Sequence, residues 1–397
     1  MSAHVSPAPG SLISVLRAAP NCLLHQPANQ HRLTAIDGLR GYAILAVTVF
    51  HLWFFGLSKL PVSVFGLRLD RLFEWGANGV GLFFALSGFC LYYPIARGRQ
   101  AAWVNFYQRR VARIMPAYLV ALLALSLVHH QSTWVGIWRH LLFVHTFSQP
   151  HIFSVVGVAW SLGTEVQFYL LFPLLVFAAR RCDWSLLLIL STAATCTARI
   201  IGMDGYTTPC PVTASLSGHL STFLWGMAAA TVIASSPPLL RRPHIRYGLW
   251  LVGFSPILMA PFISGRMHLW QWANPLLGPG WTALIVAAVS DIRLSRLWSA
   301  RPLVGLGVIS YSVYLYQDLI WMTFNRWGIR QGLSGCCLVF CALIVIGVIG
   351  YLLIERPFLR LRQNLRRSEQ PPLAQSTSQF APGPAAICSV SPGTRAG

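Results

Sequence analysis

Ten stretches of about 20 mostly apolar residues recur along this chain of 397 residues, and each is long enough to cross a bilayer as a helix. Only 10% of the residues are charged, against about 25% in an average soluble domain. The pattern therefore predicts an all-α integral membrane protein with about ten transmembrane helices. We expect these helices at residues 36–57, 77–96, 114–130, 155–178, 184–202, 216–235, 245–264, 270–290, 303–326 and 335–354.

The two ends of the chain differ from its apolar part. Residues 1–31 and 359–397 are rich in Pro, Ser, Ala and Gln, the second of them after a basic start. We expect disordered tails there, on either side of one membrane domain at residues 32–358. The apolar stretch SLISVL is too short for the core of a signal peptide. The nine cysteines show no disulfide or zinc spacing. We expect no metal site at the loop histidines His129, His130, His140 and His145, because no carboxylate or cysteine is near them.

The basic residues are distributed unevenly between the expected loops. In a soluble protein a net charge of +20 would suggest nucleic acid as a partner. In a membrane protein, Lys and Arg instead set the orientation. The segments that alternate from the N-terminus hold 22 of the 30 basic residues. This asymmetry predicts that both termini are cytoplasmic, and we expect no nucleic-acid partner.

The first apolar stretch, DGLRGYAILAVTVFH at residues 37–51, carries titratable groups near both ends. Arg40 and His51 are eleven residues apart, about three helical turns, so they share one face within roughly 20°. Asp37 lies on the same side. If Arg40 marks the cytoplasmic boundary, His51 lies about 16 Å deeper, near the centre of the membrane.

Three other expected helices place a polar side chain at a similar depth, namely Ser87, Glu165 and Tyr314. Hydroxyl groups at this depth often only join helices by hydrogen bonds. A carboxylate or an imidazole in hydrocarbon is costly and marks a functional site by default. We therefore expect Glu165 and His51 to be functional, with a purely helix-joining role as the alternative.

A basic cluster, Arg109, Arg110 and Arg113, lies just before the expected third helix. Part of this charge serves orientation, but guanidinium groups also bind phosphate through two N–H groups at once. Together with Arg40, the cluster is suited to form a phosphate-binding mouth. No GxxxxGK[ST] loop is present, which argues against a nucleoside triphosphatase.

Several motifs, taken in order, resemble those of the acyltransferase-3 family of multi-pass membrane acyltransferases. AIDGLRGYA, with the Arg-x10-His spacing of Arg40 and His51, resembles the first-helix signature of that family. FFALSGF resembles FFxxSGF, RRVARIMPAY resembles RRxxRxxPxY, and WSLGTEVQFYL resembles WSLxxExxFYL. SYSVYLYQ and IERPF match late motifs. Two positions depart from the pattern: Val166 stands where a second acid is common, and Gln317 where a histidine is common.

The resemblance implies an O-acyltransferase that takes a short acyl group from cytoplasmic acyl-CoA. The acceptor would be a hydroxyl of a carbohydrate or similar molecule, at or across the lipid bilayer. Acyl-CoA would be a co-substrate and not a permanently bound cofactor. The form would be the stand-alone one, without a fused extracytoplasmic domain.

The resemblance also suggests roles for single residues. Arg40 and His51 would be the essential pair, with His51 as the general base and Glu165 holding its imidazole as in hydrolytic triads. The expected substrate-binding residues are Asp37, Ser87, Gly88, Arg109, Arg110, Arg113, Trp160, Ser161, Tyr311, Tyr314 and Gln317.

Two other classes of protein fit parts of the sequence. A secondary transporter also carries charge at mid-membrane, but an internal repeat is expected for many of them and none is apparent here. A membrane protein with only an assembly or sensing role would not need a buried level of histidine and glutamate.

Overall fold

Helices make up nearly all of the computed structural model, which describes residues 34–57, 63–64, 67–128, 133–202, 210–258, 276–290, 292–329 and 332–360. The expected tails, His129 and His130, and residues 259–275 of the seventh and eighth expected spans lie outside these ranges. The one sheet among the described residues pairs two short strands, β1 (Ser63–Val64) and β2 (Leu67–Arg68), in antiparallel fashion.

Seven helices in the described part of the chain are long and apolar enough to cross a membrane. The prediction of an all-α, multi-pass membrane protein is therefore confirmed. The total of ten spans and the cytoplasmic position of both termini stay predictions. These seven spans are Thr34–Gly56, Leu72–Ala96, Trp103–Val128, Ala159–Arg181, Trp184–Ile201, Arg301–Arg326 and Gly332–Arg360, and two shorter apolar helices accompany them, Leu220–Ser235 and Gly278–Ser290.

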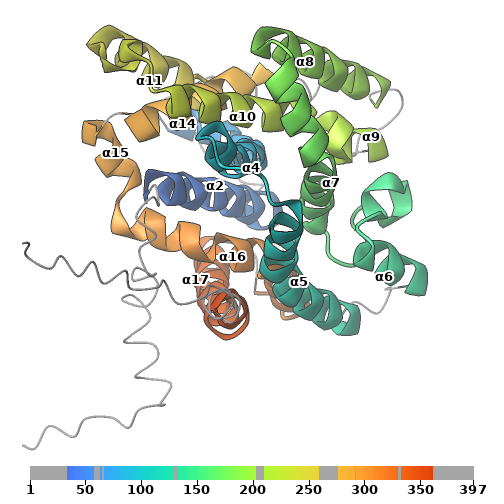
Figure 1. Cartoon of the computed structure of the whole chain (residues 1–397). Coiled ribbons are helices and arrows are strands. Elements are labelled where there is room, and N and C mark those ends of the chain that lie inside the picture. Colours follow the sequence, from blue (N-terminus) through green and yellow to red (C-terminus); the bar gives the residue numbers. More distant parts are fainter. Residues whose placement is uncertain are drawn as a thin grey trace, which may run out of the picture.

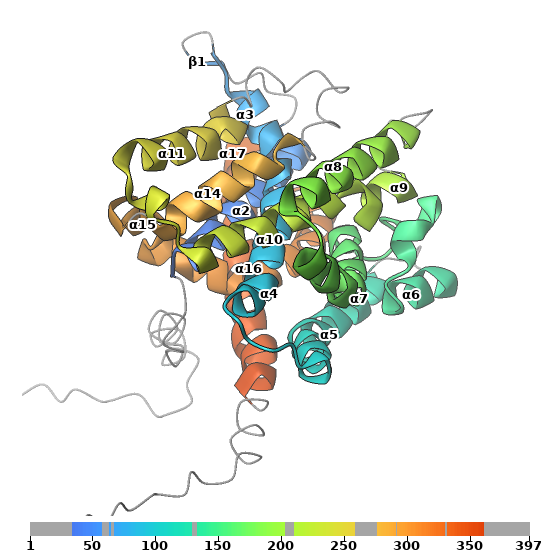
Figure 2. The same ribbon diagram turned by 45° about the horizontal axis from the view of Figure 1, so that its top comes forward.

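The spans are built from the following elements (Figures 1 and 2). The first half of the chain forms α2 (Thr34–Leu52), the π-helix η1 (Trp53–Leu57), α3 (Leu69–Trp75), η2 (Gly76–Asn78), α4 (Gly79–Ala96), α5 (Trp103–Val128), α6 (Trp134–Leu141), η3 (His145–Phe147), η4 (Gln149–His151), α7 (Ala159–Arg181) and α8 (Trp184–Ile201). The second half forms α9 (Pro211–Ala214), η5 (Leu216–Gly218), α10 (Leu220–Ser235), η6 (Pro238–Arg241), α11 (Pro243–Leu258), α14 (Gly278–Ser290), α15 (Ile292–Trp298), α16 (Arg301–Arg326), α17 (Gly332–Gly350) and the π-helix η7 (Tyr351–Glu355).

The central pair of helices is α2 and α16, which run in the same direction and touch backbone to backbone (Figure 1). A Cβ atom on Gly41 would lie only 1.9 Å from the carbonyl oxygen of Leu303, and one on Gly307 would lie 1.8 Å from that of Asp37. Small residues allow membrane helices to pack this closely. The glycines of AIDGLRGYA therefore serve the α2–α16 contact.

α4 packs between α2 and α10, antiparallel to α2 and parallel to α10. Gly79 of α4 lies against Ala43 and Val47 of α2, and a Cβ atom on Gly88 would lie 2.1 Å from the carbonyl oxygen of Phe223 in α10. Around this core, α5 and α7 form one side of the bundle and α11, α14 and α15 the other (Figure 1).

α5 corrects one expectation. It begins at Trp103, about three turns before the third span expected at residue 114, so Arg109, Arg110 and Arg113 lie within the helix and not before it. Hydropathy detects only the apolar run, whereas these arginines are sheltered by neighbouring protein. The guanidinium of Arg110, for example, lies over the ring of Tyr169 in α7, 5.6 Å from its centroid.

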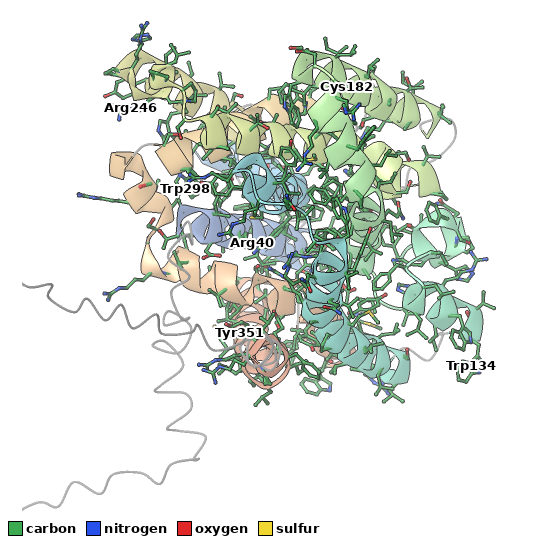
Figure 3. The ribbon with its side chains drawn as sticks, viewed as in Figure 1. Arg40, Trp134, Cys182, Arg246, Trp298 and Tyr351 are labelled. Atoms are coloured by element: carbon green, nitrogen blue, oxygen red, sulfur yellow. The ribbon has the colours of Figure 1, made fainter. Side chains whose placement is uncertain are left out.

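The connection between α5 and α7, residues 133–158, contains α6, η3 and η4 and carries exposed aromatic residues, such as Trp134 at the edge of the molecule (Figure 3). His140 and His145 are fully buried in it and stack with ring centroids 3.9 Å apart. The hydroxyl of Tyr118 in α5 donates to the carbonyl oxygen of His140 at 3.0 Å. In the described part of the chain, no three potential ligands are grouped to hold a metal.

Candidate active site

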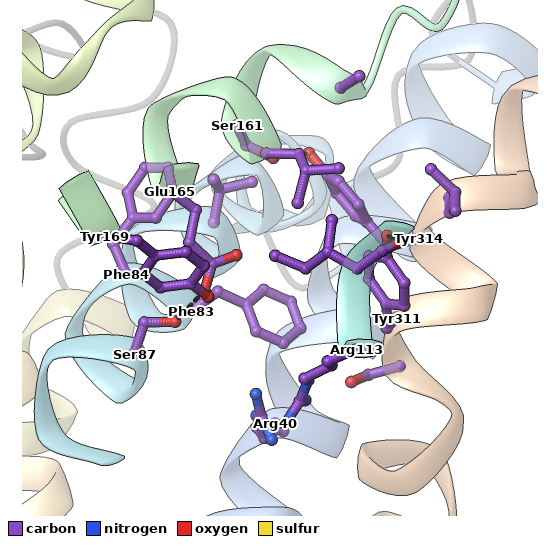
Figure 4. A pocket seen from close by; sticks show the side chains of 16 residues that line it. Arg40, Phe83, Phe84, Ser87, Arg113, Ser161, Glu165, Tyr169, Tyr311 and Tyr314 are labelled. Atoms are coloured by element: carbon purple, nitrogen blue, oxygen red, sulfur yellow. Dashed lines mark hydrogen bonds between the residues drawn. The ribbon is translucent and has the colours of Figure 1, made fainter. Parts of the chain in front are cut away.

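A cavity of about 80 Å³ lies where α2, α4, α5, α7 and α16 meet (Figure 4). Seven of the fourteen residues expected at the site line it, and they come from all five helices. These seven are Arg40, Ser87, Arg113, Ser161, Glu165, Tyr311 and Tyr314. The other lining residues are Val80, Phe83, Phe84, Ile114, Ala159, Leu162, Tyr169, Ser310 and Leu315.

One wall of the cavity holds the carboxylate of Glu165 in α7. Its Oε1 accepts hydrogen bonds from Ser87 Oγ at 2.6 Å and from the hydroxyl of Tyr169 at 2.5 Å. Ser161, Glu165 and Tyr169 follow one another at intervals of four residues, so one face of α7 carries them all. The carboxylate is therefore fixed by two donors.

Facing this carboxylate are two arginines, Arg40 from α2 and Arg113 from α5, which lie side by side in Figure 4. Arg40 is six residues into its helix and Arg113 ten, so they lie about 9 Å and about 15 Å from the helix starts. The guanidinium of Arg113 acts on that of Arg40 as a like charge. The Nε of Arg40 is buried and has no hydrogen-bond partner among the described residues. An anionic ligand would relieve both features.

The third wall is formed by tyrosines of α16 whose hydroxyls are tied to backbone carbonyls. Tyr311 donates to the carbonyl oxygen of Ile114 in α5 at 2.9 Å, and Tyr314 to that of Val158 at 3.0 Å. The hydroxyls of Tyr314 and Ser161 are also 2.8 Å apart. These bonds hold both rings in place and join α16 to α5 and α7.

His51 does not line this cavity. Since α2 and α16 are parallel and Gly41 lies beside Leu303 and Gly307, His51 is approximately level with Gln317, beyond Tyr314. The residue of α2 that shares the cavity with Ser87, Glu165 and Tyr314 is therefore Arg40 and not His51, whereas the depth of Arg40 and His51 in the membrane stays a prediction.

The imidazole of His51 is oriented by its own helix. Its Nδ1 lies 2.9 Å from the carbonyl oxygen of Val47. A carbonyl oxygen only accepts, so Nδ1 carries the hydrogen and Nε2 bears the free electron pair. The rings of Phe50 and Phe55 flank it, with centroids 5.0 and 5.9 Å away. The role expected for Glu165, holding this imidazole, is thus filled by Val47.

Four more expected residues surround the arginines or the cavity wall. Asp37 is buried one turn before Arg40. Arg109 and Arg110 lie on α5 outside the lining, and the ring of Trp160 packs on Phe84, with centroids 6.4 Å apart.

The last two expected residues lie away from the lining. Gly88 faces α10, and this contact accounts for the glycine by packing. Gln317 is fully buried, and its amide has no hydrogen-bond partner among the described residues. Binding roles for these residues stay predictions.

The sequence analysis missed Glu355. It ends the π-helix η7, is only 6% exposed, and accepts a short hydrogen bond from Ser312 of α16. Arg113 and Arg40 are the charged groups that act on it. The last span was expected to end at residue 354, which placed Glu355 outside the membrane. The available signal was its position beside the apolar run in IERPF.

This cavity, with two arginines opposite a fixed carboxylate, is the candidate active site of a multi-pass membrane protein. The profile of the acyltransferase-3 family, described as an acyltransferase domain, matches residues 33–356. The chain therefore belongs to this family of membrane acyltransferases, as its motifs suggested, and is an enzyme that needs an acyl donor.

Curated relatives agree with this family. The exopolysaccharide production protein ExoZ of Rhizobium meliloti is 27% identical over 310 residues, which cover 72% of this chain and 91% of that protein. The O-acetyltransferase OatA of Staphylococcus aureus is 22% identical over 372 residues, 82% of this chain and 57% of OatA. The chain thus spans little more than half the length of OatA. No solved structure matches the chain.

Proposed function

We propose that this protein transfers a short acyl group, such as acetyl, from cytoplasmic acyl-CoA to a hydroxyl of a cell-envelope carbohydrate. The observation that carries the proposal is the pair Arg40 and Arg113, held together inside the membrane domain with a buried Nε that lacks a partner among the described residues. Phosphate groups of CoA supply the matching charge. The names of the relatives, an O-acetyltransferase and an exopolysaccharide production protein, support the reaction class and a carbohydrate acceptor.

The shape of the site supports a donor that threads through it. Arg40 is approximately level with Leu306, so Tyr314 is about 12 Å further along α16, and His51 is about 16 Å along α2 from Arg40. The extended pantetheine arm of CoA spans such a length. With the phosphates at the arginines, the arm follows the cavity past Glu165 and brings the thioester to the level of Tyr314 and His51.

The proposed chemistry uses the free Nε2 of His51. It takes the proton of the acceptor hydroxyl while that oxygen attacks the thioester carbonyl carbon. The carbon–sulfur bond then breaks, and the thiolate of CoA receives the proton from His51. A cavity of about 80 Å³ has room for only a few water-sized groups. This size favours a short acyl group over a long chain.

The test is the release of free CoA from acetyl-CoA by purified protein in proteoliposomes, with and without a soluble oligosaccharide acceptor. We expect acceptor-dependent release that falls at least tenfold in Arg113→Gln. The control is Arg97→Gln at the exposed end of α4, which keeps the wild-type rate. Acceptor movement into the vesicles without CoA release would overturn the proposal in favour of a transporter.

A further inference from the structure

A second cavity lies on the other side of α2 from the candidate active site. It has a volume of about 300 Å³ and is lined by residues of α2, α3, η2, α4, α11 and α14. In Figures 1 and 2, α11 and α14 lie on a different side of α2 from α5 and α7. The lining is mostly apolar, with Val49, Phe73 and Ile257 among its side chains. No step of the proposed reaction uses this cavity.

The second cavity faces the back of α2. Successive residues of an α-helix are rotated by about 100°, so Tyr42, Leu45 and Val49 lie roughly 140–200° around α2 from Arg40. These three residues line the second cavity, whereas Arg40 lines the first. No charged residue is found among the described residues that line the second cavity. α2 therefore separates a cavity with charged groups from a cavity suited to an apolar ligand.

The second cavity is only partly enclosed, and its open side is continuous with the surface that faces lipid. Leu72 lines the cavity, is 39% exposed and begins the span Leu72–Ala96. The cavity is therefore reached from the bilayer, where lipid chains take the place of solvent. Apolar cavities exclude water and bind apolar ligands, so a lipid chain is the natural occupant.

Two tryptophans of the second cavity place a further requirement on its ligand. Trp75 and Trp281 line the cavity and are only 5% and 2% exposed. The indole Nε1 of each is buried and has no hydrogen-bond partner among the described residues. An indole N–H only donates, and leaving it buried without an acceptor is costly. A ligand that suits this cavity therefore combines an apolar chain with at least one acceptor oxygen.

The position of Trp75 indicates where that oxygen lies. Trp75 is three residues into the span Leu72–Ala96, close to its beginning. Tryptophan is enriched at this depth, the interface between membrane and water. The ester groups of a phospholipid lie in the same interfacial region, directly above its acyl chains. A phospholipid therefore supplies both the apolar chain and the acceptor oxygen from the bilayer itself.

We propose that the second cavity binds part of one acyl chain of a phospholipid, with an ester carbonyl oxygen that accepts from Trp75 or Trp281. The chain packs on the back of α2, the helix whose other face carries Arg40 and His51. This site does not depend on the identity of the acyl donor or the acceptor, so it goes beyond the proposed function.

The test uses purified protein reconstituted with a phosphatidylcholine that carries a diazirine on one acyl chain. The protein is then extracted into detergent and washed, so that illumination labels only lipid that stays bound. We expect the label mainly on the peptides of α2 and α3 that contain Val49 and Phe73. Ala46→Phe should lower this labelling roughly tenfold, because the new ring and the lipid chain cannot share the cavity. The matched control is Leu174→Phe on the exposed face of α7, which keeps the labelling.

Two further variants test the acceptor oxygen. Trp75→Phe and Trp281→Phe keep an aromatic ring but remove the indole N–H. We expect the lipid retained by the double variant to fall roughly three- to tenfold, the effect of losing one hydrogen bond. Trp134→Phe is the control, because this indole is 78% exposed at the edge of the molecule. The double variant keeps the proposal testable if Ala46→Phe fails to fold.

Three outcomes would overturn the proposal. Labelling spread evenly over the lipid-facing helices of wild-type protein, or kept in Ala46→Phe, would remove the site. Unchanged lipid retention in the double tryptophan variant would remove the acceptor role of the indoles. Displacement of the label by a polyprenyl phosphate, at concentrations where unlabelled phosphatidylcholine has no effect, would replace the phospholipid by a prenyl chain. None of these measurements depends on acyl transfer, so this site and the proposed function can fail separately.

Discussion

The cavity and the α5–α7 connection both bury titratable side chains, but they do so in opposite ways. In the cavity, two arginines face Glu165, and the Nε of Arg40 lacks a partner among the described residues. In the connection, the rings of His140 and His145 stack on each other with an interplanar angle of 10°. Among the described residues, the only charged groups that act on His140 are histidines, and none acts on His145.

The difference separates a site from a packed core. In the cavity, the buried N–H donor of Arg40 lacks a hydrogen-bond partner among the described residues, and leaving such a donor without one is costly. A bound ligand that accepts from this donor would remove that cost. The stacked imidazoles carry no charge for a ligand to neutralise, because burial favours their uncharged form. A buried histidine therefore indicates chemistry here only where a free ring nitrogen lies near the charged level, as at His51.

The largest expected effect comes from the histidines themselves. His51→Ala should lower acyl transfer per folded molecule by roughly 10²–10⁴-fold, since it removes the general base. The matched control is His145→Phe, which replaces one stacked ring by another and should keep the rate. Transfer rates from acetyl-CoA, normalised to folded protein, decide the matter. Near-wild-type transfer by His51→Ala would refute the proposed base.

A smaller loss is expected on neutralising the carboxylate of the cavity. Glu165→Gln keeps the size of the side chain but removes the charge opposite Arg40 and Arg113, so donor and catalytic groups lose alignment. We expect a decrease of roughly tenfold to a hundredfold in kcat. Ser87→Ala, which deletes one donor to Glu165 and leaves the charge, should have a milder effect. A Glu165→Gln variant with unchanged kcat but lower thermal stability would assign Glu165 to helix packing alone.

Packing around the cavity gives the next effect, on stability. Gly41→Ala would place a methyl group against the carbonyl of Leu303, and we expect a loss of about 1–3 kcal/mol from overpacking. Gly305→Ala is the matched control on α16, because nothing lies within 4 Å of its added methyl group. Thermal unfolding in detergent should show a lower Tm only for Gly41→Ala. Equal Tm values for Gly41→Ala and Gly305→Ala would mean that α2 and α16 can move apart to accommodate the added methyl group at little cost in stability.

The smallest effect concerns pH at the α5–α7 connection. Burial lowers the pKa of His145 to about 4 and also lowers that of His140. When the connection opens, both residues return toward their ordinary value near 6.5. The open form therefore binds protons first as pH falls from about 6.5 toward 4, and the closed form loses stability over that window.

The groups that face this pair are Tyr118, Ser154, His151 and the backbone near Gly163, none of them acidic. We expect a loss of about 1 kcal/mol per histidine between pH 7 and pH 5.5. Hydrogen exchange of residues 133–158, corrected for intrinsic rates, measures it. His145→Phe should remove about half of the pH dependence of exchange. If the exchange of wild-type protein does not change with pH, His140 and His145 do not become exposed when this connection opens.

The sequence predicted the helical membrane fold and half of the site for a common physical reason. Apolar length identifies spans, and a polar group within a span stands out against its surroundings, which is how Glu165, Ser87 and Tyr314 were found to share a level. Identifying spans by apolar length fails at helix ends. It placed Arg113 before its helix and Glu355 after its helix, whereas both lie within helices. Charged residues are tolerated there because neighbouring protein, and not lipid, surrounds them.

The spacing of apolar and polar residues in the sequence did not predict which helices contact one another. Nothing in the spacing of residues showed that Val47, and not Glu165, bonds to His51, or that α2 runs beside α16 in the same direction. Depth along one helix is readable from residue counts, whereas its rotation and offset against a neighbour depend on packing at residues such as Gly41 and Gly307.

The interlocked glycines of α2 and α16 also limit how this enzyme can move. Because the backbone of α2 packs directly on that of α16, neither helix can slide or rotate without separating from the other. We therefore expect α2 and α16 to move as one rigid unit. Arg40, Tyr311 and Tyr314 then keep their mutual spacing in any motion. If the cavity opens, we therefore expect α5 and α7 to move, because they contact α16 through tyrosine hydroxyls and not through closely packed backbones.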